Sequence, residues 1–151
     1  MGFIVSASVV FFDQLTKFLA LDKLNYGISV PVFKNIFHLT LVRNTGIAFG
    51  LFKDSTIILI FISLIAVMFI LRYWFLRKEK LDRLVKFSLF LILGGAIGNL
   101  IDRFRFGYVV DFLDFRVWPV FNVADSCITI GAVLIGLRIL INQKQGLSGK
   151  Q

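Results

Sequence analysis

The chain has 151 residues, 58% of them hydrophobic and only 17% charged, which excludes an ordinary soluble domain and predicts one membrane-embedded domain over residues 1–151. Its formal net charge is +8. The basic residues lie at the ends of apolar segments and form no separate basic domain, so we expect no nucleic-acid partner. Cys127 is the single cysteine, which excludes an internal disulfide bond.

Four segments are long and apolar enough to cross a bilayer, since a helical span needs roughly 20 mostly apolar residues. They are predicted at about residues 1–21, 55–76, 84–103 and 120–141. The first contains Asp13 and Lys17, which stand four residues apart and therefore share one helix face. We interpret them chiefly as an internal ion pair, which could also brace a functional site.

The segment between the first two spans has the pattern of strands rather than of a helix. In "IFHLTLVRN", every second residue from Phe37 to Leu41 is apolar, which is a strand period. The segments "ISVPV" and "IAFGLF" are predicted to pair with this strand through turns at residues 34–35 and 45–46. We therefore expect a small outer β region over about residues 28–52, resting on the membrane surface.

The connector between the second and third spans indicates the orientation in the membrane. Its basic residues are Arg72, Arg77, Lys78, Lys80, Arg83 and Lys86. Because basic loops stay in the cytoplasm, this connector is predicted to be cytoplasmic. With four spans, both termini are then cytoplasmic, and residues 22–54 and 103–119 face outward.

The third span combines small and polar residues. Gly94 and Gly98 form a small-xxx-small pair, which lets another helix approach closely. Asn99 and Asp102 stand three residues apart on one helix face. Taken alone, this pattern predicts a helix-packing seam with polar contacts.

The fourth span carries a polar stripe formed by Asn122, Asp125 and Thr129. Trp118 and Pro119 predict an interfacial anchor and a helix start, which places Asp125 ~10 Å along the helix axis at about 1.5 Å per residue. A carboxylate at that depth, with no basic residue nearby in the sequence, is hard to explain by packing.

Asp111 precedes Asp125 by fourteen residues and lies in a predicted loop that starts at Arg103. The loop is long enough to bring the two carboxylates together. Two facing carboxylates near lipid share one proton, and the pair then supplies an acid and a base for water-mediated peptide hydrolysis. The other interpretation, in which an aspartate only caps a helix or pairs with Arg103 or Arg116, stays open.

Two further candidates compete for a catalytic role. Asp114 lies three residues after Asp111, and spacing alone does not separate the two. A nucleophilic pair of Cys127 and His38 would need hydrogen-bond contact, and a packed thiol beside a surface histidine is the interpretation we favour. The sequence has no Cys/His cluster with metal-ligand spacing and no nucleotide-binding or nucleophile-elbow motif, so it predicts neither a metal nor an organic cofactor.

Four sequence blocks, "FFDQLTK", "RNTGIAFG", "GGAIGNLIDRFRFGYVVDF" and "FNVADS", resemble the signature of the bacterial lipoprotein signal peptidase, signal peptidase II. They follow the family's order from Phe11 to Ser126, which is nearly the whole chain. The resemblance implies a mainly α membrane protein of four transmembrane helices, with a small extracytoplasmic β-sheet, the cradle, between helices 1 and 2. It also implies an aspartyl endopeptidase that removes the signal peptide from diacylglyceryl-modified prolipoproteins, cutting just before the lipid-modified cysteine.

The resemblance also implies residue roles. Asp111 of "VVDF" and Asp125 of "FNVAD" match the catalytic pair. The positions that match substrate-binding or supporting residues are Asn44, Asn99, Arg103 and Asn122. The positions that match structural support are Asp13, Lys17 and Asp102.

For the surroundings of the site, the resemblance implies no metal or organic cofactor. The implied partners are a diacylglyceryl-modified prolipoprotein and membrane lipid, and we expect a monomer. The implied location is the bacterial cytoplasmic membrane, with the active site near its extracytoplasmic face.

Two other functions fit parts of the sequence. A small proton-coupled transporter or channel subunit could use Asp13, Asp102 and Asp125 as a proton path, and its acids should then be spread across the membrane depth. Most acids instead collect at the predicted outer end, which favours a surface-accessible site. A non-catalytic scaffold built on the glycine seam would tolerate Asp125→Asn, because an amide still forms hydrogen bonds.

Overall fold

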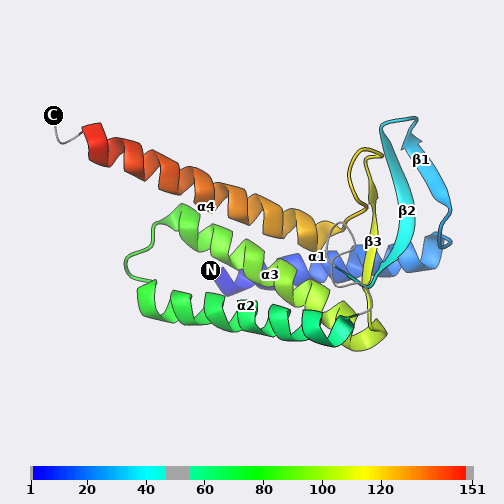
Figure 1. Cartoon of the computed structure of the whole chain (residues 1–151), viewed down its shortest axis with the longest axis horizontal. Coiled ribbons are helices and arrows are strands. Elements are labelled where there is room, and N and C mark those ends of the chain that lie inside the picture. Colours follow the sequence, from blue (N-terminus) through cyan, green and yellow to red (C-terminus); the bar gives the residue numbers. More distant parts are fainter. Residues whose placement is uncertain (1, 47–54, 149–151) are drawn as a thin grey trace.

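The computed structural model describes residues 2–46 and 55–148. Its helices are α1 (Gly2–Lys23), α2 (Thr56–Arg77), α3 (Arg83–Phe106) and α4 (Val123–Ser148), and its strands are β1 (Ser29–Phe33), β2 (Phe37–Asn44) and β3 (Val109–Asp114). The helices lie side by side in an elongated bundle, and the sheet stands across one end of it (Figure 1). The beginning of α1 and the end of α4 lie away from the sheet (Figure 1).

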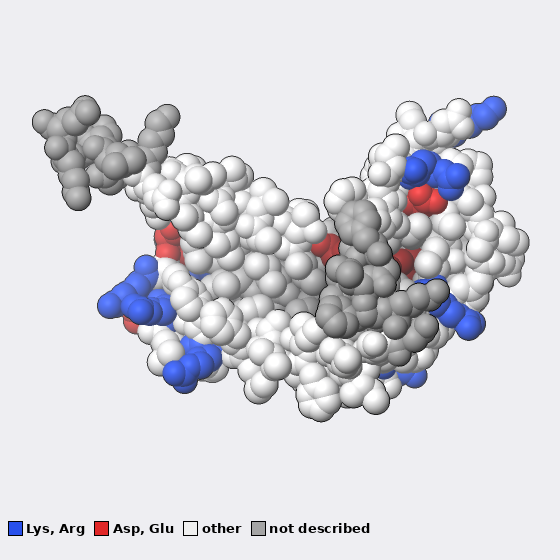
Figure 2. Space-filling view, viewed as in Figure 1, with Lys and Arg blue, Asp and Glu red and all other residues white. Residues whose placement is uncertain are grey.

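All four helices are long and apolar enough to cross a membrane, which confirms the four predicted spans. Charged side chains gather mainly at the two ends of the molecule, and the visible face between them is uncharged apart from a few acidic atoms near the sheet (Figure 2). Helix α3 is the central element and packs against α1, α2 and α4. The helices are therefore arranged around α3, with their apolar outer faces available to lipid.

The glycine seam of α3 is the reason for this close packing. A Cβ atom on Gly94 would come within 2.9 Å of the Ser6 carbonyl oxygen on α1. One on Gly98 would come within 2.5 Å of the Asp13 carboxylate, so a larger residue there would displace a polar side chain of α1. The predicted seam is confirmed, and at Gly98 it also makes room for a buried acid.

The ends of α3 and α4 differ from the prediction. Helix α3 continues to Phe106 and stops at Gly107, whose φ of 78° lies in the left-handed region that glycine adopts easily. Helix α4 starts at Val123 and not at Pro119, because the Asn122 side-chain oxygen accepts a hydrogen bond from the Asp125 backbone N–H at 2.8 Å. Asp125 thus lies in the first turn of α4, and the predicted depth of ~10 Å along the helix is wrong.

The sheet is antiparallel with strand order β1-β2-β3. The predicted pairing of "ISVPV" with the central strand is confirmed, with Asn35 in the connecting turn at a φ of 63°. The predicted pairing of "IAFGLF" falls on residues 47–52, which lie outside the described residues. The second edge of β2 pairs instead with β3 from the α3–α4 connection, a segment that the sequence analysis treated as a loop.

A small hydrophobic cluster joins the sheet to the bundle. Its buried members are Ala20 on α1, Leu41 on β2, and Val110 and Phe112 on β3. Because Val110 and Phe112 point toward this cluster, the alternation of a strand turns Asp111 to the opposite face of β3. The position of Asp111 is therefore set by the packing of its neighbours.

Candidate active site

Asp111 is held between two amide side chains. It lies on β3 opposite Val42 of β2, where the strand pairing shifts register, and it is only 1% exposed. Asn44, at the end of β2, donates a hydrogen bond through Nδ2 to Asp111 Oδ2 at 2.8 Å. Asn122, before the first turn of α4, donates through Nδ2 to Asp111 Oδ1 at 2.6 Å. Both carboxylate oxygens are therefore oriented by donors from different elements.

Asp125 is held by a third amide and borders open space. Asn99 on α3 donates a hydrogen bond through Nδ2 to Asp125 Oδ1 at 2.7 Å. Asn122 Nδ2 also lies 3.1 Å from Asn99 Oδ1, so the two amides link the two aspartates. Asp125 lines a cavity of about 400 Å³ whose other walls include Phe115, Phe121, Ser126, Thr129 and Ile130.

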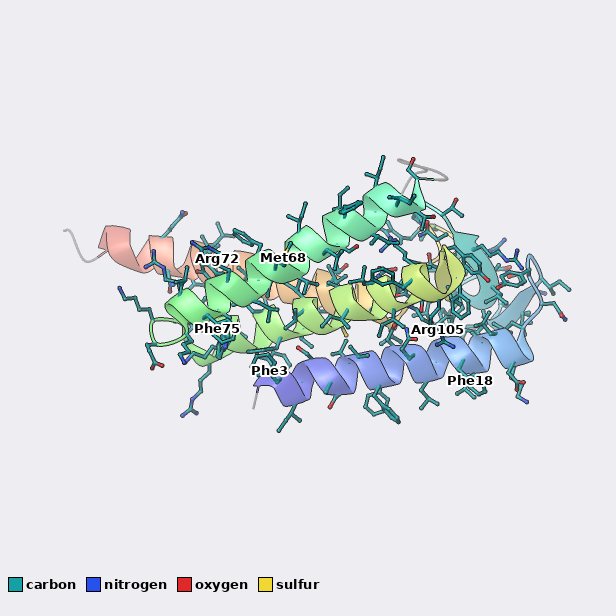
Figure 3. All side chains as sticks on the ribbon, turned by 90° about the horizontal axis from the view of Figure 1, so that it is seen from below. Phe3, Phe18, Met68, Arg72, Phe75 and Arg105 are labelled. Carbon is teal, nitrogen blue, oxygen red and sulfur yellow. The ribbon has the colours of Figure 1, made fainter. Side chains whose placement is uncertain are left out.

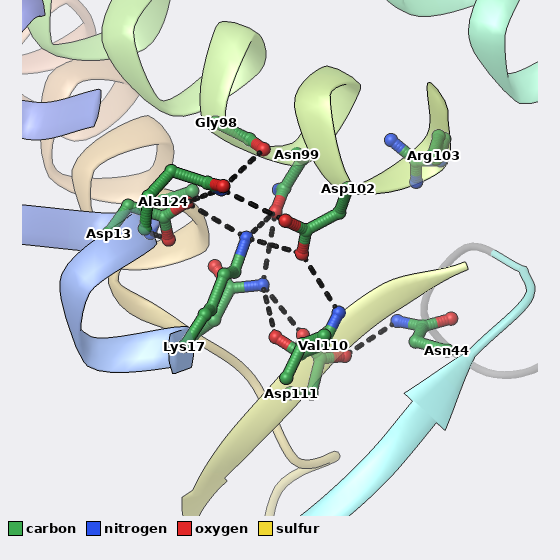
Figure 4. Close-up of polar contacts among 12 residues, drawn as sticks. Asp13, Lys17, Asn44, Gly98, Asn99, Asp102, Arg103, Val110, Asp111 and Ala124 are labelled. Atoms are coloured by element: carbon green, nitrogen blue, oxygen red, sulfur yellow. Dashed lines mark hydrogen bonds and ion pairs between the residues drawn. The ribbon is translucent and has the colours of Figure 1, made fainter. Parts of the chain in front are cut away.

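Lys17 lies at the centre of the polar cluster behind the two aspartates. Figure 4 shows that its contacts join α1 to α3, and that Asp102 continues the link from α3 to β3. The Lys17 ammonium group forms ion pairs with Asp13 and Asp102, both at 2.9 Å, and donates a hydrogen bond to Asn99 Oδ1 at 2.9 Å. Because Lys17 occupies the oxygen of the Asn99 amide, the nitrogen of that amide is directed at Asp125. The predicted ion pair of Asp13 and Lys17 is thus present, and it also braces the site.

The two acids of this cluster hold backbone groups in place. Asp13 accepts a hydrogen bond from the Ala124 N–H at 2.9 Å, and Asp102 accepts one from the Val110 N–H at 3.0 Å. Each contact lies beside a candidate catalytic residue, since Ala124 precedes Asp125 and Val110 precedes Asp111. Gln14, which the sequence analysis missed, donates to Asp102 at 2.9 Å, and its place inside the block "FFDQLTK" is the only signal that could have found it.

The environment of Asp111 raises its pKa to about 7. Burial is the largest cause, and the nearby charge of Asp125 acts in the same direction, while the hydrogen bonds from Asn44 and Asn122 oppose both. Near neutral pH, Asp111 is therefore present in both protonated and ionised forms. A pair in which one carboxyl keeps its proton is the state that acid and base catalysis together require.

Arg103 lies on the turn of α3 that follows Asp102, beside the site (Figure 4). Its guanidinium is 3.4 Å from the Ser63 hydroxyl, and among the described residues it forms no ion pair with any carboxylate. The alternative in which Asp111 or Asp125 pairs with Arg103 or Arg116 is therefore not what the described residues show.

Asp114 lies apart from this arrangement, on the opposite face of β3 from Asp111. It accepts a hydrogen bond from the Thr40 hydroxyl at 2.8 Å and forms an ion pair with Arg116 at 3.1 Å. Burial acts to raise the pKa of Asp114, but the bonds from Thr40 and Arg116 outweigh burial and hold that pKa below its usual value. Asp114 is thus an ionised structural residue.

The Cys127–His38 pair, the alternative that the sequence analysis did not favour, is not formed within the described part of the chain. His38 Nδ1 lies 2.8 Å from the Ser29 hydroxyl on the sheet, whereas Cys127 is on α4. Across residues 2–46 and 55–143, no group of three or more His, Cys, Asp or Glu side chains is arranged to hold a metal ion.

Comparisons with known proteins point to one family. Residues 5–141 match the family described as signal peptidase (SPase) II. The chain is 46% identical over 146 residues to the lipoprotein signal peptidase of Halothermothrix orenii, covering 97% of this chain and 99% of that protein. It is 50% identical over 137 residues to the lipoprotein signal peptidase of Caldanaerobacter subterraneus subsp. tengcongensis, covering 90% and 93% of the two chains.

The fold also matches solved structures. A structure described as a bacterial membrane enzyme superposes with a TM-score of 0.88 at 31% identity, covering 95% of this chain and 90% of the other. A second bacterial membrane enzyme structure gives a TM-score of 0.83 at 32% identity, covering 92% of each chain. The arrangement of four apolar helices with a small sheet is therefore the fold of a known class of membrane enzyme.

Proposed function

Because the chain belongs to the signal peptidase II family, whose members cleave signal peptides from prolipoproteins, we propose that it does so with Asp111 and Asp125 as an aspartyl catalytic pair. One observation carries this proposal. Two carboxylates from separate elements are held by Asn44, Asn122 and Asn99 and are linked to each other through the last two amides. Such an arrangement orients two acids without neutralising either of them with a cation.

In the proposed mechanism, the pair shares one proton. The ionised aspartate takes a proton from a water molecule, which attacks the scissile carbonyl carbon. The protonated aspartate donates its proton to the carbonyl oxygen, and the leaving amine is protonated as the peptide bond breaks. The raised pKa of Asp111 supports this, because it keeps a carboxylic acid available near neutral pH.

The supporting residues divide into two groups. Asn44, Asn99 and Asn122 already donate to the catalytic carboxylates, so we assign them to orienting the pair. Among the described residues, the hydrogen-bond contact of the Arg103 guanidinium is with the Ser63 hydroxyl at 3.4 Å, and we assign this guanidinium to binding the substrate backbone. Asp13, Lys17 and Asp102 form the structural support behind the pair.

The proposed substrate is a prolipoprotein whose cysteine carries a diacylglyceryl group, cut just before that cysteine. The cavity beside Asp125 is lined largely by Phe115, Phe121 and Ile130, which suits a substrate anchored in lipid. We further propose that the sheet end faces outward and both termini face the cytoplasm. The basic residues at the opposite end of the bundle support this orientation.

The test uses purified protein and a prolipoprotein with or without the diacylglyceryl group, followed by gel shift and mass analysis of the product. We expect cleavage just before the modified cysteine and very poor cleavage of the unmodified form. Asp125→Asn should lower the rate about 10²- to 10⁴-fold while leaving folded protein in the membrane. Equal cleavage of both substrates would contradict the substrate proposal, and an active Asp125→Asn variant would contradict the mechanism.

A further inference from the structure

A long apolar groove runs along the bundle between α1 and α2, on a face that the catalytic aspartates do not share. Both helices pack on α3, and Figure 3 shows them on either side of it, with Phe3 near the beginning of α1. The groove has a volume of about 520 Å³, and its walls include Phe3, Val10, Leu71, Leu93 and Ile97. A groove of this size and chemistry fits a hydrocarbon chain.

The polar atom in the groove wall is already satisfied. Ser6 lines the groove, and its hydroxyl donates a hydrogen bond to the Phe90 carbonyl oxygen at 2.7 Å. Ser6 therefore needs no hydrogen bond from a molecule bound in the groove. An occupant that is purely apolar along this stretch would leave no polar group unpaired.

At the end of the bundle away from the sheet, the groove meets a second cavity of about 350 Å³. Phe3 lines both cavities, so the two are adjacent. An aromatic cluster forms the inner wall, with the Phe90 ring centroid 4.9 Å from that of Phe3 and 4.8 Å from that of Trp74. The outer wall differs, because Arg83 and Lys86 contribute to it.

Arg83 and Lys86 are cations without counter-ions in the described residues. Neither forms an ion pair or a side-chain hydrogen bond with any residue whose side chain is described. The neighbouring acid, Asp82, is occupied by Arg138 at 2.6 Å. The second cavity therefore offers two positive charges at the mouth of an apolar groove.

We propose that the two cavities together form a binding site for one anionic phospholipid. Arg83 and Lys86 bind its phosphate, and one acyl chain lies in the groove between α1 and α2. Basic pockets between membrane helices are suited to anionic headgroups, and only a lipid carries the required anion and a long hydrocarbon chain in one molecule. The basic n-region of a signal peptide is excluded from this cavity by charge, because two cations line it.

The test measures retention of phosphatidylglycerol by the detergent-purified full chain, using native mass spectrometry after mixing with phosphatidylglycerol or phosphatidylcholine. We expect one phosphatidylglycerol per chain and no comparable retention of phosphatidylcholine. The double variant Arg83→Gln/Lys86→Gln should bind phosphatidylglycerol about 25-fold more weakly, since each basic residue near an anionic headgroup is worth about fivefold in affinity. Glycerol phosphate alone should not displace the bound lipid, because it lacks the acyl chain.

Two matched variants separate this site from general charge attraction. Arg77→Gln/Lys78→Gln removes the same charge from the end of α2 without touching either cavity, and it should retain the lipid as the unmodified chain does. Val5→Phe fills the second cavity without changing charge, and it should weaken binding at least tenfold. Equal loss in the two charge variants, unchanged binding in Arg83→Gln/Lys86→Gln or Val5→Phe, or equal retention of both lipids would overturn the proposal. Gel-filtration elution and melting temperature confirm that each variant is folded.

Discussion

The two faces of β3 carry two aspartates that are close in sequence but opposite in behaviour. Asp111 and Asp114 stand three residues apart, and their exposed fractions are 1% and 5%. Asp111 accepts hydrogen bonds from neutral amides near a second carboxylate, and its pKa rises to about 7. Asp114 meets the Thr40 hydroxyl and the Arg116 guanidinium, and its pKa falls. Burial dominates at Asp111, whereas the hydrogen bonds and charge from Thr40 and Arg116 outweigh burial at Asp114, so a low exposed fraction alone does not make an acid–base residue.

The most direct test of the difference between Asp111 and Asp114 is to replace each of them in turn by asparagine. Asp111→Asn should lower prolipoprotein cleavage about 10²- to 10⁴-fold, because it removes one member of the acid–base pair. Asp114→Asn should keep cleavage within about twofold, because its contacts hold the sheet and not the catalytic pair. Initial cleavage rates at equal amounts of folded protein are the measurement. A dead Asp114→Asn beside an active Asp111→Asn would reverse the assignment.

The second test compares two cations that pair with buried aspartates, Lys17 and Arg116. Lys17 is 2% exposed and contacts Asp13 and Asp102, so Lys17→Met leaves two buried carboxylates without their shared cation. We expect it to lower the free energy of unfolding by about 3–5 kcal/mol. Arg116→Gln should cost only about 0–1 kcal/mol, because its ion pair with Asp114 is half-exposed. Denaturant unfolding in detergent measures both, and equal losses would show that the Lys17 cluster is not the main support.

The third test asks whether the pKa of Asp111 sets the pH dependence of cleavage. The cleavage rate should be bell-shaped against pH, because low pH protonates both catalytic carboxyls and high pH ionises both. The alkaline limb should lie near neutrality, since the pKa of Asp111 is about 7. The hydrogen bond from Asn44 lowers that pKa, so Asn44→Ala should move the alkaline limb to higher pH.

The control for this profile lies on the other face of β3. Thr40→Val removes a hydrogen bond to Asp114, whose ionisation plays no part in the proposed reaction, and it should leave both limbs in place. An Asn44→Ala profile that stays fixed, or a Thr40→Val profile that moves, would show that Asp111 does not control the alkaline limb.

The comparison also shows which parts of the structure the sequence could predict. Four helices follow from apolar segments of bilayer length, and the β1–β2 hairpin follows from its alternating pattern. Strand β3 was mistaken for a loop because it is a short strand whose partner, β2, lies far away in the sequence. Its β-branched run and the alternation of Val110 and Phe112 with Asp111 were the available signal.

The members of the candidate site could be proposed from the sequence, but their geometry could not. The spacing and the motifs proposed Asp111 and Asp125 as the pair, yet the start of α4 depends on the cap formed by Asn122, which hydropathy cannot detect. Because Asp125 lies in the first turn of α4, its position at the sheet end of the bundle follows from where that helix starts. The orientation of the Asn99 amide depends on Lys17 from another helix, so it follows from tertiary contact alone.

The smallest effect is expected for a change at Ser29, which lies in a chain of hydrogen bonds leading to Asp114. His38 Nδ1 lies 2.8 Å from the Ser29 hydroxyl, the Thr40 and Ser29 hydroxyl oxygens are 2.9 Å apart, and Thr40 donates to Asp114 at 2.8 Å. A hydroxyl has one proton to donate, so one consistent arrangement runs from His38 through Ser29 and Thr40 to Asp114. Ser29→Ala interrupts this chain while leaving the bond between Thr40 and Asp114 intact. We expect it to lower the free energy of unfolding by about 1 kcal/mol and to leave both the cleavage rate and its pH profile unchanged. Denaturant unfolding and rate measurements on the same preparation provide the check, and a changed pH profile would mean that the two faces of β3 are coupled.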